Sequence, residues 1–78
     1  MPRFYFDFSE NGIVHPDFEG TELVGSEEAR LEVLDIIRDV AKDEVPAGPA
    51  RHYAVKVREA DGPALITISL VMQVDRPN

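Results

Sequence analysis

The sequence predicts an α+β domain in the order β-β-α-β-β, a two-layer sandwich with one helix packed on one face of a four-stranded antiparallel sheet. Three observations support this fold class. Aromatic residues alternate near the N-terminus, apolar residues recur at helical spacing over about 26–44, and two alternating segments flank Asp61-Gly62. The chain has 78 residues, the size of one domain, so we expect a single domain over 1–78.

The first strand is predicted over residues 3–8, where Phe4, Phe6 and Phe8 alternate with polar or amphipathic side chains. Because successive side chains of a strand point to opposite faces, these three rings share one face. Three of the four phenylalanines of the chain lie here. We therefore expect this strand to anchor the hydrophobic core.

A hairpin is predicted at Asn11-Gly12, a dipeptide that favours the tight turn between antiparallel strands. The return strand, 13–15, is short because a proline follows it, and prolines are tolerated at sheet edges. Its register has two solutions. A two-residue loop places Phe8 opposite His15, whereas a four-residue loop places Phe8 opposite Ile13.

The helix is predicted over 26–44, after a connector at 16–25 that contains two glycines. Ser26 is expected to be the N-cap, and the acids that follow it suit the helix dipole. One stripe should face the sheet and the opposite stripe should face solvent. The apolar stripe is Val33, Leu34, Ile37, Val40, Ala41 and Val45, and the acidic stripe is Glu28, Glu32, Asp35, Asp39 and Asp43. Prolines and a glycine at 46–49 should end the helix.

Two further strands are predicted over 52–60 and 64–74. A two-residue loop at Asp61-Gly62 would set three apolar pairs on one face: Tyr53 with Leu70, Val55 with Ile68, and Val57 with Ile66. The last strand also carries apolar residues on its other face, which indicates a central strand or a strand with a partner covering it. We therefore expect the first and last strands in the middle of the sheet, with the 52–60 strand at an edge.

Composition excludes several classes of function. The chain has no cysteine, which excludes disulfides, thiolate metal sites and cysteine catalysis. No apolar run approaches the ~20 residues of a membrane-spanning helix, and no secretory signal is present, so we expect a cytoplasmic protein. A net charge of -7 opposes non-specific binding to nucleic acid or anionic lipid.

No catalytic motif is present. The serines Ser9, Ser26 and Ser69 are better explained by a turn, a helix cap and an outward strand position. One constellation has the residue types of a divalent metal site: Asp7, His15, Asp17, Glu19 and Glu22. Its spacing matches no metal motif, and a solvated acidic loop is the favoured explanation. We predict no catalytic residue, no metal and no cofactor, and keep a metal-assisted hydrolase using His15, Asp17 and Glu19 as the least favoured hypothesis.

The sheet face away from the helix is predicted to be mildly basic. It should display the binding-face candidates Arg3, Tyr5, His52, Lys56 and Arg58. The segment 26–45 carries seven acids against three bases, so charge is divided between the layers. A basic face with an aromatic residue is typical of sheets that bind RNA or small anions, although Tyr5 alone is a credible stacking residue. Binding of a small ligand or of nucleic acid is therefore the alternative function.

Apolar residues outside the expected core point to assembly. Leu65 and Val71 lie on the outer face of the last strand, and Leu31 and Ile36 flank the helix stripe. A homodimer would cover such surface and compensate for a small core. The leading prediction is a non-enzymatic protein-interaction module, homodimeric, that binds a protein partner or a second copy through its sheet edge or outer face. The acidic surface would favour a basic partner.

Two stretches resemble a known family. The opening Met1-Pro2-Arg3-Phe4-Tyr5-Phe6-Asp7 and the segment Asp17-Phe18-Glu19-Gly20-Thr21-Glu22-Leu23 resemble short uncharacterised proteins of rhizobia and related alphaproteobacteria. The likeness extends to the last hairpin. Members often carry His where this chain has Asp7, which weakens a ligand role for that position. Because the family is a domain of unknown function, the resemblance implies a bacterial origin and a compact fold, and no functional residues.

Overall fold

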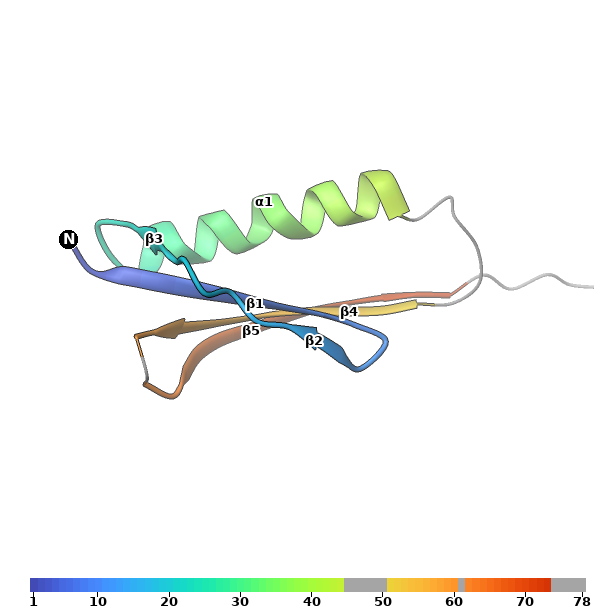
Figure 1. Ribbon diagram of the computed structural model, residues 1–78. Helices are drawn as coiled ribbons and strands as arrows, with labels where there is room; N and C mark the ends of the chain where they lie inside the picture. The colour runs from blue at the N-terminus through green and yellow to red at the C-terminus, as the bar shows by residue number, and fades with distance from the viewer. Residues whose placement is uncertain (45–50, 61, 74–78) are drawn as a thin grey trace, which may run out of the picture.

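The computed structural model describes residues 1–44, 51–60 and 62–73 of the chain. Its elements are β1 (Arg3–Glu10), β2 (Ile13–His15), β3 (Thr21–Glu22), α1 (Ser26–Glu44), β4 (Arg51–Glu59) and β5 (Ala64–Met72). The helix α1 covers one face of the sheet and leaves the other face open (Figure 1). The predicted α+β class and the two-layer arrangement are confirmed. No helix of the described residues is long and apolar enough to span a membrane.

The first hairpin adopts the two-residue loop. Phe8 lies opposite His15, and Glu10 lies opposite Ile13. Asn11 and Gly12 have φ angles of 51° and 86°, which only Gly and Asn adopt readily. The Asn11 side chain also accepts a 3.0 Å hydrogen bond from the backbone N–H of His52, which ties the turn to β4.

The sheet has five strands and not the four predicted from the sequence. The additional strand is β3, a two-residue segment in which Glu22 lies opposite Arg3 and Thr21 lies opposite Phe4. Two residues are too few to show alternation, so the predicted connector gave no sign of this strand. Both β2 and β3 pair with the same edge of β1, one at each end.

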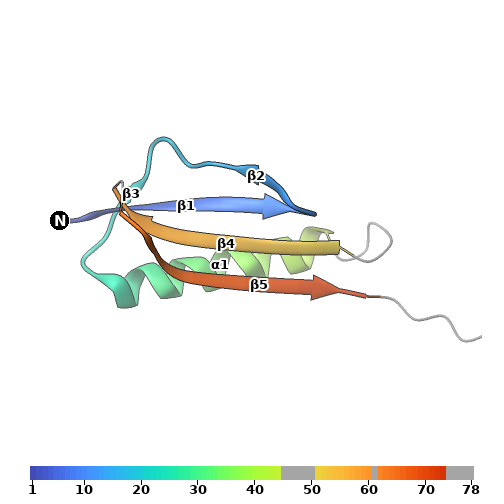
Figure 2. The same cartoon turned by 90° about the horizontal axis from the view of Figure 1, so that it is seen from below.

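The strand order is β2-β1-β4-β5, so the predicted order was wrong: β4 is central and β5 is at the edge (Figure 2). The pairing of β1 with β4 places Phe6 opposite Val57 and Phe8 opposite Val55. Both valines of β4 are fully buried, whereas no residue of β5 is. The strand with the fully buried core residues, β4, therefore lies in the centre of the sheet. The exposed apolar residues of β5 do not indicate that β5 is a central strand.

The hairpin of β4 and β5 has the three predicted apolar pairs, Tyr53 with Leu70, Val55 with Ile68 and Val57 with Ile66. Beyond Val57 the register shifts, because Arg58 lies opposite Ala64. Leu65 is the extra residue of this irregularity, which the predicted two-residue loop did not include. Asp61, part of that predicted loop, lies outside the described residues.

The core lies between α1 and the phenylalanine face of the sheet. Its buried members are Phe4, Ala29, Val33, Val55 and Val57. Ile36 packs against them together with Ile37, so Ile36 belongs to the core-facing side of α1 and not to its flank as predicted. The N–H of Ala29 donates to the carbonyl of Gly25, which makes Gly25 and not Ser26 the N-cap. The predictions for Val45 and for the residues that end the helix fall outside the described residues.

Candidate functional site

The open face brings together most of the predicted binding residues. Tyr5 lies opposite Arg58, and Lys56 of β4 lies opposite Asp7 of β1. Arg3 lies at the same end of the face as Tyr5. The fifth candidate, His52, lies near the start of β4 beside Val71 of β5 and is not part of this group. The sheet register thus gathers four of the five residues.

Arg58 is bound by its own chain. Its Nε donates to Asp7 Oδ2 at 2.8 Å, and one Nη donates to the carbonyl of Asp17 at 3.2 Å. The guanidinium also lies over the Tyr5 ring, 4.5 Å from its centroid. The side chains of Arg58 and Asp7 are only 24% and 13% exposed. This guanidinium therefore holds three parts of the fold together and presents little charge to an external anion.

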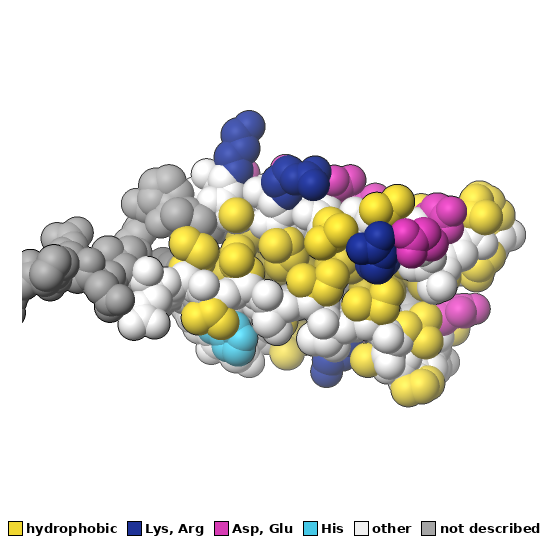
Figure 3. All heavy atoms as spheres, turned by 180° about the vertical axis from the view of Figure 1, so that it is seen from behind, with side chains coloured by type: hydrophobic (Ala, Val, Ile, Leu, Met, Phe, Trp, Pro, Cys, Tyr) yellow, Lys and Arg dark blue, Asp and Glu magenta, His cyan; other side chains and the backbone are white. Residues whose placement is uncertain are grey.

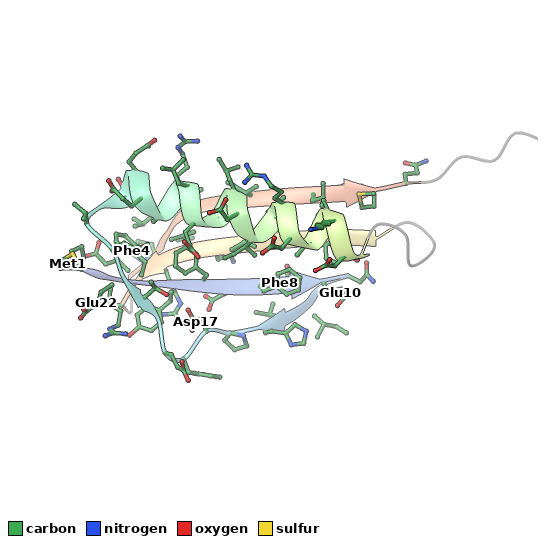
Figure 4. All side chains as sticks on the ribbon, turned by 90° about the horizontal axis from the view of Figure 1, so that it is seen from above. Met1, Phe4, Phe8, Glu10, Asp17 and Glu22 are labelled. Atoms are coloured by element: carbon green, nitrogen blue, oxygen red, sulfur yellow. The ribbon has the colours of Figure 1, made fainter. Side chains whose placement is uncertain are left out.

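Asp17 replaces a missing strand along β1. Among the described strands, none pairs with the outer edge of the middle of β1, because β2 pairs with its end and β3 with its start. Figure 4 shows Asp17 on the connector beside this part of β1. Its carboxylate accepts hydrogen bonds of 3.1 Å from the N–H groups of Phe6, Glu19 and Gly20. Burial raises the pKa of Asp17, but these three bonds and the charge of Arg58 outweigh it, so its pKa lies below the usual value.

Asp7 completes this cluster. Its Oδ1 accepts a 2.9 Å hydrogen bond from the N–H of Asp17, while Oδ2 binds Arg58. Burial raises the pKa of Asp7, and the hydrogen bond from Arg58, the N–H of Asp17 and the Arg58 charge together lower it below its usual value. Both carboxylates thus stay ionised near neutral pH and are occupied by structural bonds. They are poor candidates for general acids or bases, which need pKa values near the working pH.

The connector also covers Arg3 and Tyr5. Gly20 has a φ of 73°, and a Cβ on it would lie 2.8 Å from Arg3 Cγ and 3.0 Å from Tyr5 Cε1. Arg3 in turn donates to the carbonyl of Glu19 at 2.7 Å and to Glu22 at 3.3 Å. The Asp-x-Glu-Gly part of the sequence therefore has a structural reason: the aspartate binds the turn, and the glycine lets it lie close to β1.

Lys56 lines a hollow on the open face whose lining is mainly apolar. This hollow has a volume of about 100 Å³ and is lined by Asp7, Ser9, Val14, Ala54, Lys56 and Thr67. The Asp7 carboxylate in its lining opposes an anionic ligand. No group of three His, Asp or Glu side chains among the described residues is placed to hold a metal ion. His15, which belongs to the least favoured metal hypothesis, stacks on Phe8 with ring centroids 6.3 Å apart.

The outer edge of β5 offers a different kind of site. No strand of the described chain pairs with this edge, and none of its nine residues is charged. Ile66, Ile68 and Leu70 are half-buried on the helix side, while Leu65 and Val71 are 49% and 67% exposed. Figure 3 shows the resulting band of apolar side chains between α1 and the sheet.

The flank of α1 above this band carries balanced charge. Arg30, Leu34, Arg38 and Lys42 recur every four residues and share one stripe, and its three basic members are the only bases of α1. Figure 3 shows Lys and Arg side chains along the helix on this side. Arg30 binds Glu27 at 2.8 Å and Arg38 binds Asp35 at 2.9 Å. Four of the other acids of the helix repeat on another stripe: Glu28, Glu32, Asp39 and Asp43.

Comparison with known sequences identifies the family. A family described as a domain of unknown function, DUF6894, matches residues 3–71. The chain belongs to the DUF6894 family. Both the open-face cluster and nearly all of β5 lie inside the DUF6894 match, so the candidate sites belong to the family domain and not to an addition. Searches of curated proteins and of solved structures gave no match. The predicted resemblance to a family of unknown function is confirmed, and the alphaproteobacterial origin stays a prediction.

Proposed function

We propose that this DUF6894 protein is a non-enzymatic protein-interaction module that works as a homodimer, with the edge of β5 as its interface. One observation carries the proposal: β5 is a nine-residue edge strand without a single charge and with apolar side chains on both faces. Natural sheets protect their edges with charges, prolines, bulges or short strands. The irregularity disturbs only the Ala64 end of β5, and the edge from Leu65 onward is suited to strand pairing.

A second copy suits this edge better than it suits the other surfaces of the chain. The protein carries a net charge of -7, so most of its surfaces repel one another at close range. The β5 edge is uncharged, and the two Arg residues on the flank above it are bound to acids of their own helix. Contact along β5 thus joins two copies with little electrostatic cost, and it covers Leu65 and Val71, the predicted interface residues.

The non-enzymatic part of the proposal is supported by the bonds of the open face. Asp7, Asp17 and Arg58 are each bound to backbone or to one another, so these three charged groups are committed to structural bonds. The alternative of a ligand-binding or nucleic-acid-binding face has less support, because Arg3 and Arg58 already bind acceptors of their own chain. A bacterial, cytoplasmic setting remains part of the proposal.

The test is the solution mass by light scattering over a range of concentrations, with a matched pair of variants. Ser69→Lys places a charge on the exposed face of β5, and Ser9→Lys places the same charge on the same sheet face at β1, away from the edge. We expect a wild-type dimer, a dissociation constant raised about tenfold or more by Ser69→Lys, and little change for Ser9→Lys. A wild-type monomer at every concentration, or equal weakening by both variants, would refute the proposed interface.

A further inference from the structure

We infer that the second copy lays its β5 antiparallel to the first, with Ile68 opposite Ile68 of the second copy. This register rests on the proposed homodimer and adds to it the side chains that meet. In an antiparallel pair, residues directly opposite each other point to the same face of the sheet. Because each copy uses the same strand, a two-fold axis must pass through the centre of the pairing. The available registers therefore centre on Thr67, Ile68 or Ser69.

Among these registers, the one centred on Ile68 pairs all of β5 from Leu65 to Val71, and only Ala64, beyond the irregularity, and Met72 opposite it fall outside the regular alternation. It also places Leu65 of one copy opposite Val71 of the other, twice per dimer. These are the two exposed large apolar residues of β5, and both belong to its open-face set. The register buries them against each other on a face where no helix covers them, and apolar cross-strand pairs of this kind stabilise a sheet.

The neighbouring registers leave both apolar residues against unsuitable partners. Centring on Thr67 places Leu65 opposite Ser69 and Val71 opposite Pro63, which has no N–H to donate. Centring on Ser69 places Leu65 opposite Gln73 and Val71 opposite Thr67. Hydrophobic matching therefore selects the register centred on Ile68.

The helix face agrees with the same register. It sets Leu70 opposite Ile66 of the second copy and the two Ile68 side chains opposite each other, and all of these are half-buried in one chain. The two-fold axis is then perpendicular to the sheet, so both α1 helices lie on the same face. The flanks with Arg30, Leu34 and Arg38 then turn toward each other.

A charge exchange between positions 65 and 71 tests the register. We expect Leu65→Lys alone and Val71→Glu alone each to raise the dimer dissociation constant about tenfold or more. The double variant should return to within a few-fold of wild type, because each Lys then lies opposite a Glu of the second copy. Within one chain the two positions are six residues apart on one strand, about 20 Å, so they cannot pair there. Wild-type-like circular dichroism of each variant establishes that the fold is kept.

Three single-cysteine variants give a second, independent readout, because the natural chain has no cysteine. Under mild oxidation, Ile68→Cys should form the disulfide-linked dimer fastest, ahead of Thr67→Cys and Ser69→Cys. Fastest crosslinking of Thr67→Cys or Ser69→Cys would overturn the register, as would a double charge variant no tighter than the single ones. Those results would leave the homodimer intact, whereas a monomeric wild-type protein would remove the proposed function as well.

Discussion

Replacement of Asp17 by Ala tests whether one carboxylate substitutes for a strand along β1. The change removes the acceptor of three backbone N–H groups, each bound at 3.1 Å. The N–H of Phe6 is part-buried and would be left without a partner, which costs about 1–3 kcal/mol. The N–H groups of Glu19 and Gly20 regain water, so each loses only about 0.5–1 kcal/mol. We expect the free energy of unfolding to fall by about 2–5 kcal/mol, most of what a domain of this size has.

The measurement is urea unfolding followed by far-ultraviolet circular dichroism, with Asp39→Ala as the control. Asp39 is exposed on α1, so its removal should change the free energy of unfolding by less than about 0.5 kcal/mol. Amide hydrogen exchange adds a local readout, because the N–H of Phe6 should lose protection in Asp17→Ala. A loss of stability no larger than that of the control, or an unchanged exchange rate at Phe6, would refute the structural role of the carboxylate.

Three further outcomes are expected. Gly20→Ala should destabilise the protein by about 1–3 kcal/mol more than Gly12→Ala in urea unfolding, because both have positive φ but only Gly20 faces side chains at contact distance; equal losses would contradict this. The stability contributed by Asp7 and Asp17 should be fully present above about pH 4 and should fall as the pH drops through their lowered folded-state pKa values. Asp17→Asn should make this fall in the free energy of unfolding less steep. A pH profile of that variant parallel to the wild-type profile would contradict the link between Asp17 ionisation and stability. Tyr53→Phe should raise the free energy of unfolding by about 1 kcal/mol, because the buried hydroxyl has no hydrogen-bond partner among the described residues; calorimetry showing a lower melting temperature would reject it.

Local patterns predicted most of the elements correctly. The alternating phenylalanines, the Asn11-Gly12 turn and the helical apolar stripe each depend on residues close together in the chain, and each produced the expected element. The three apolar pairs of the last hairpin were also correct, because the alternation of its two strands sets their register, although the chain near the turn differs from the prediction at Leu65.

The predicted strand order was wrong because the apolar outer face of β5 was interpreted as the mark of a central strand. An apolar outer face has two explanations, a neighbour within the chain or a partner outside it, and the sequence pattern is the same for both. The choice depends on which strand β1 joins, and the pairing of Phe6 with Val57 and Phe8 with Val55 decides it. This pairing spans about fifty residues of sequence, so no local signal reports it.

The sequence predicted which residues lie on the open face, and the structure shows that some of them already bind groups of their own chain. The sequence placed Arg3, Tyr5, Lys56 and Arg58 on one face correctly, since alternation along each strand fixes the face of a side chain. The sequence did not show that Asp17, in the connector, would accept a hydrogen bond from the backbone of β1 with its carboxylate and one from Arg58 with its carbonyl. A short Asp-x-x-Gly turn signal was present at Asp17, but its target on β1 lies eleven residues away in the chain.

The sequence alone determined the class of the fold, the faces of its strands and its acidic charge, because composition and short-range periodicity are sufficient for these. The tertiary structure decided which strand lies at the edge, which charges are already paired, and therefore which surface is left for a partner. Those properties depend on contacts between distant segments, where burial and hydrogen bonding select one arrangement among several that satisfy the same local pattern.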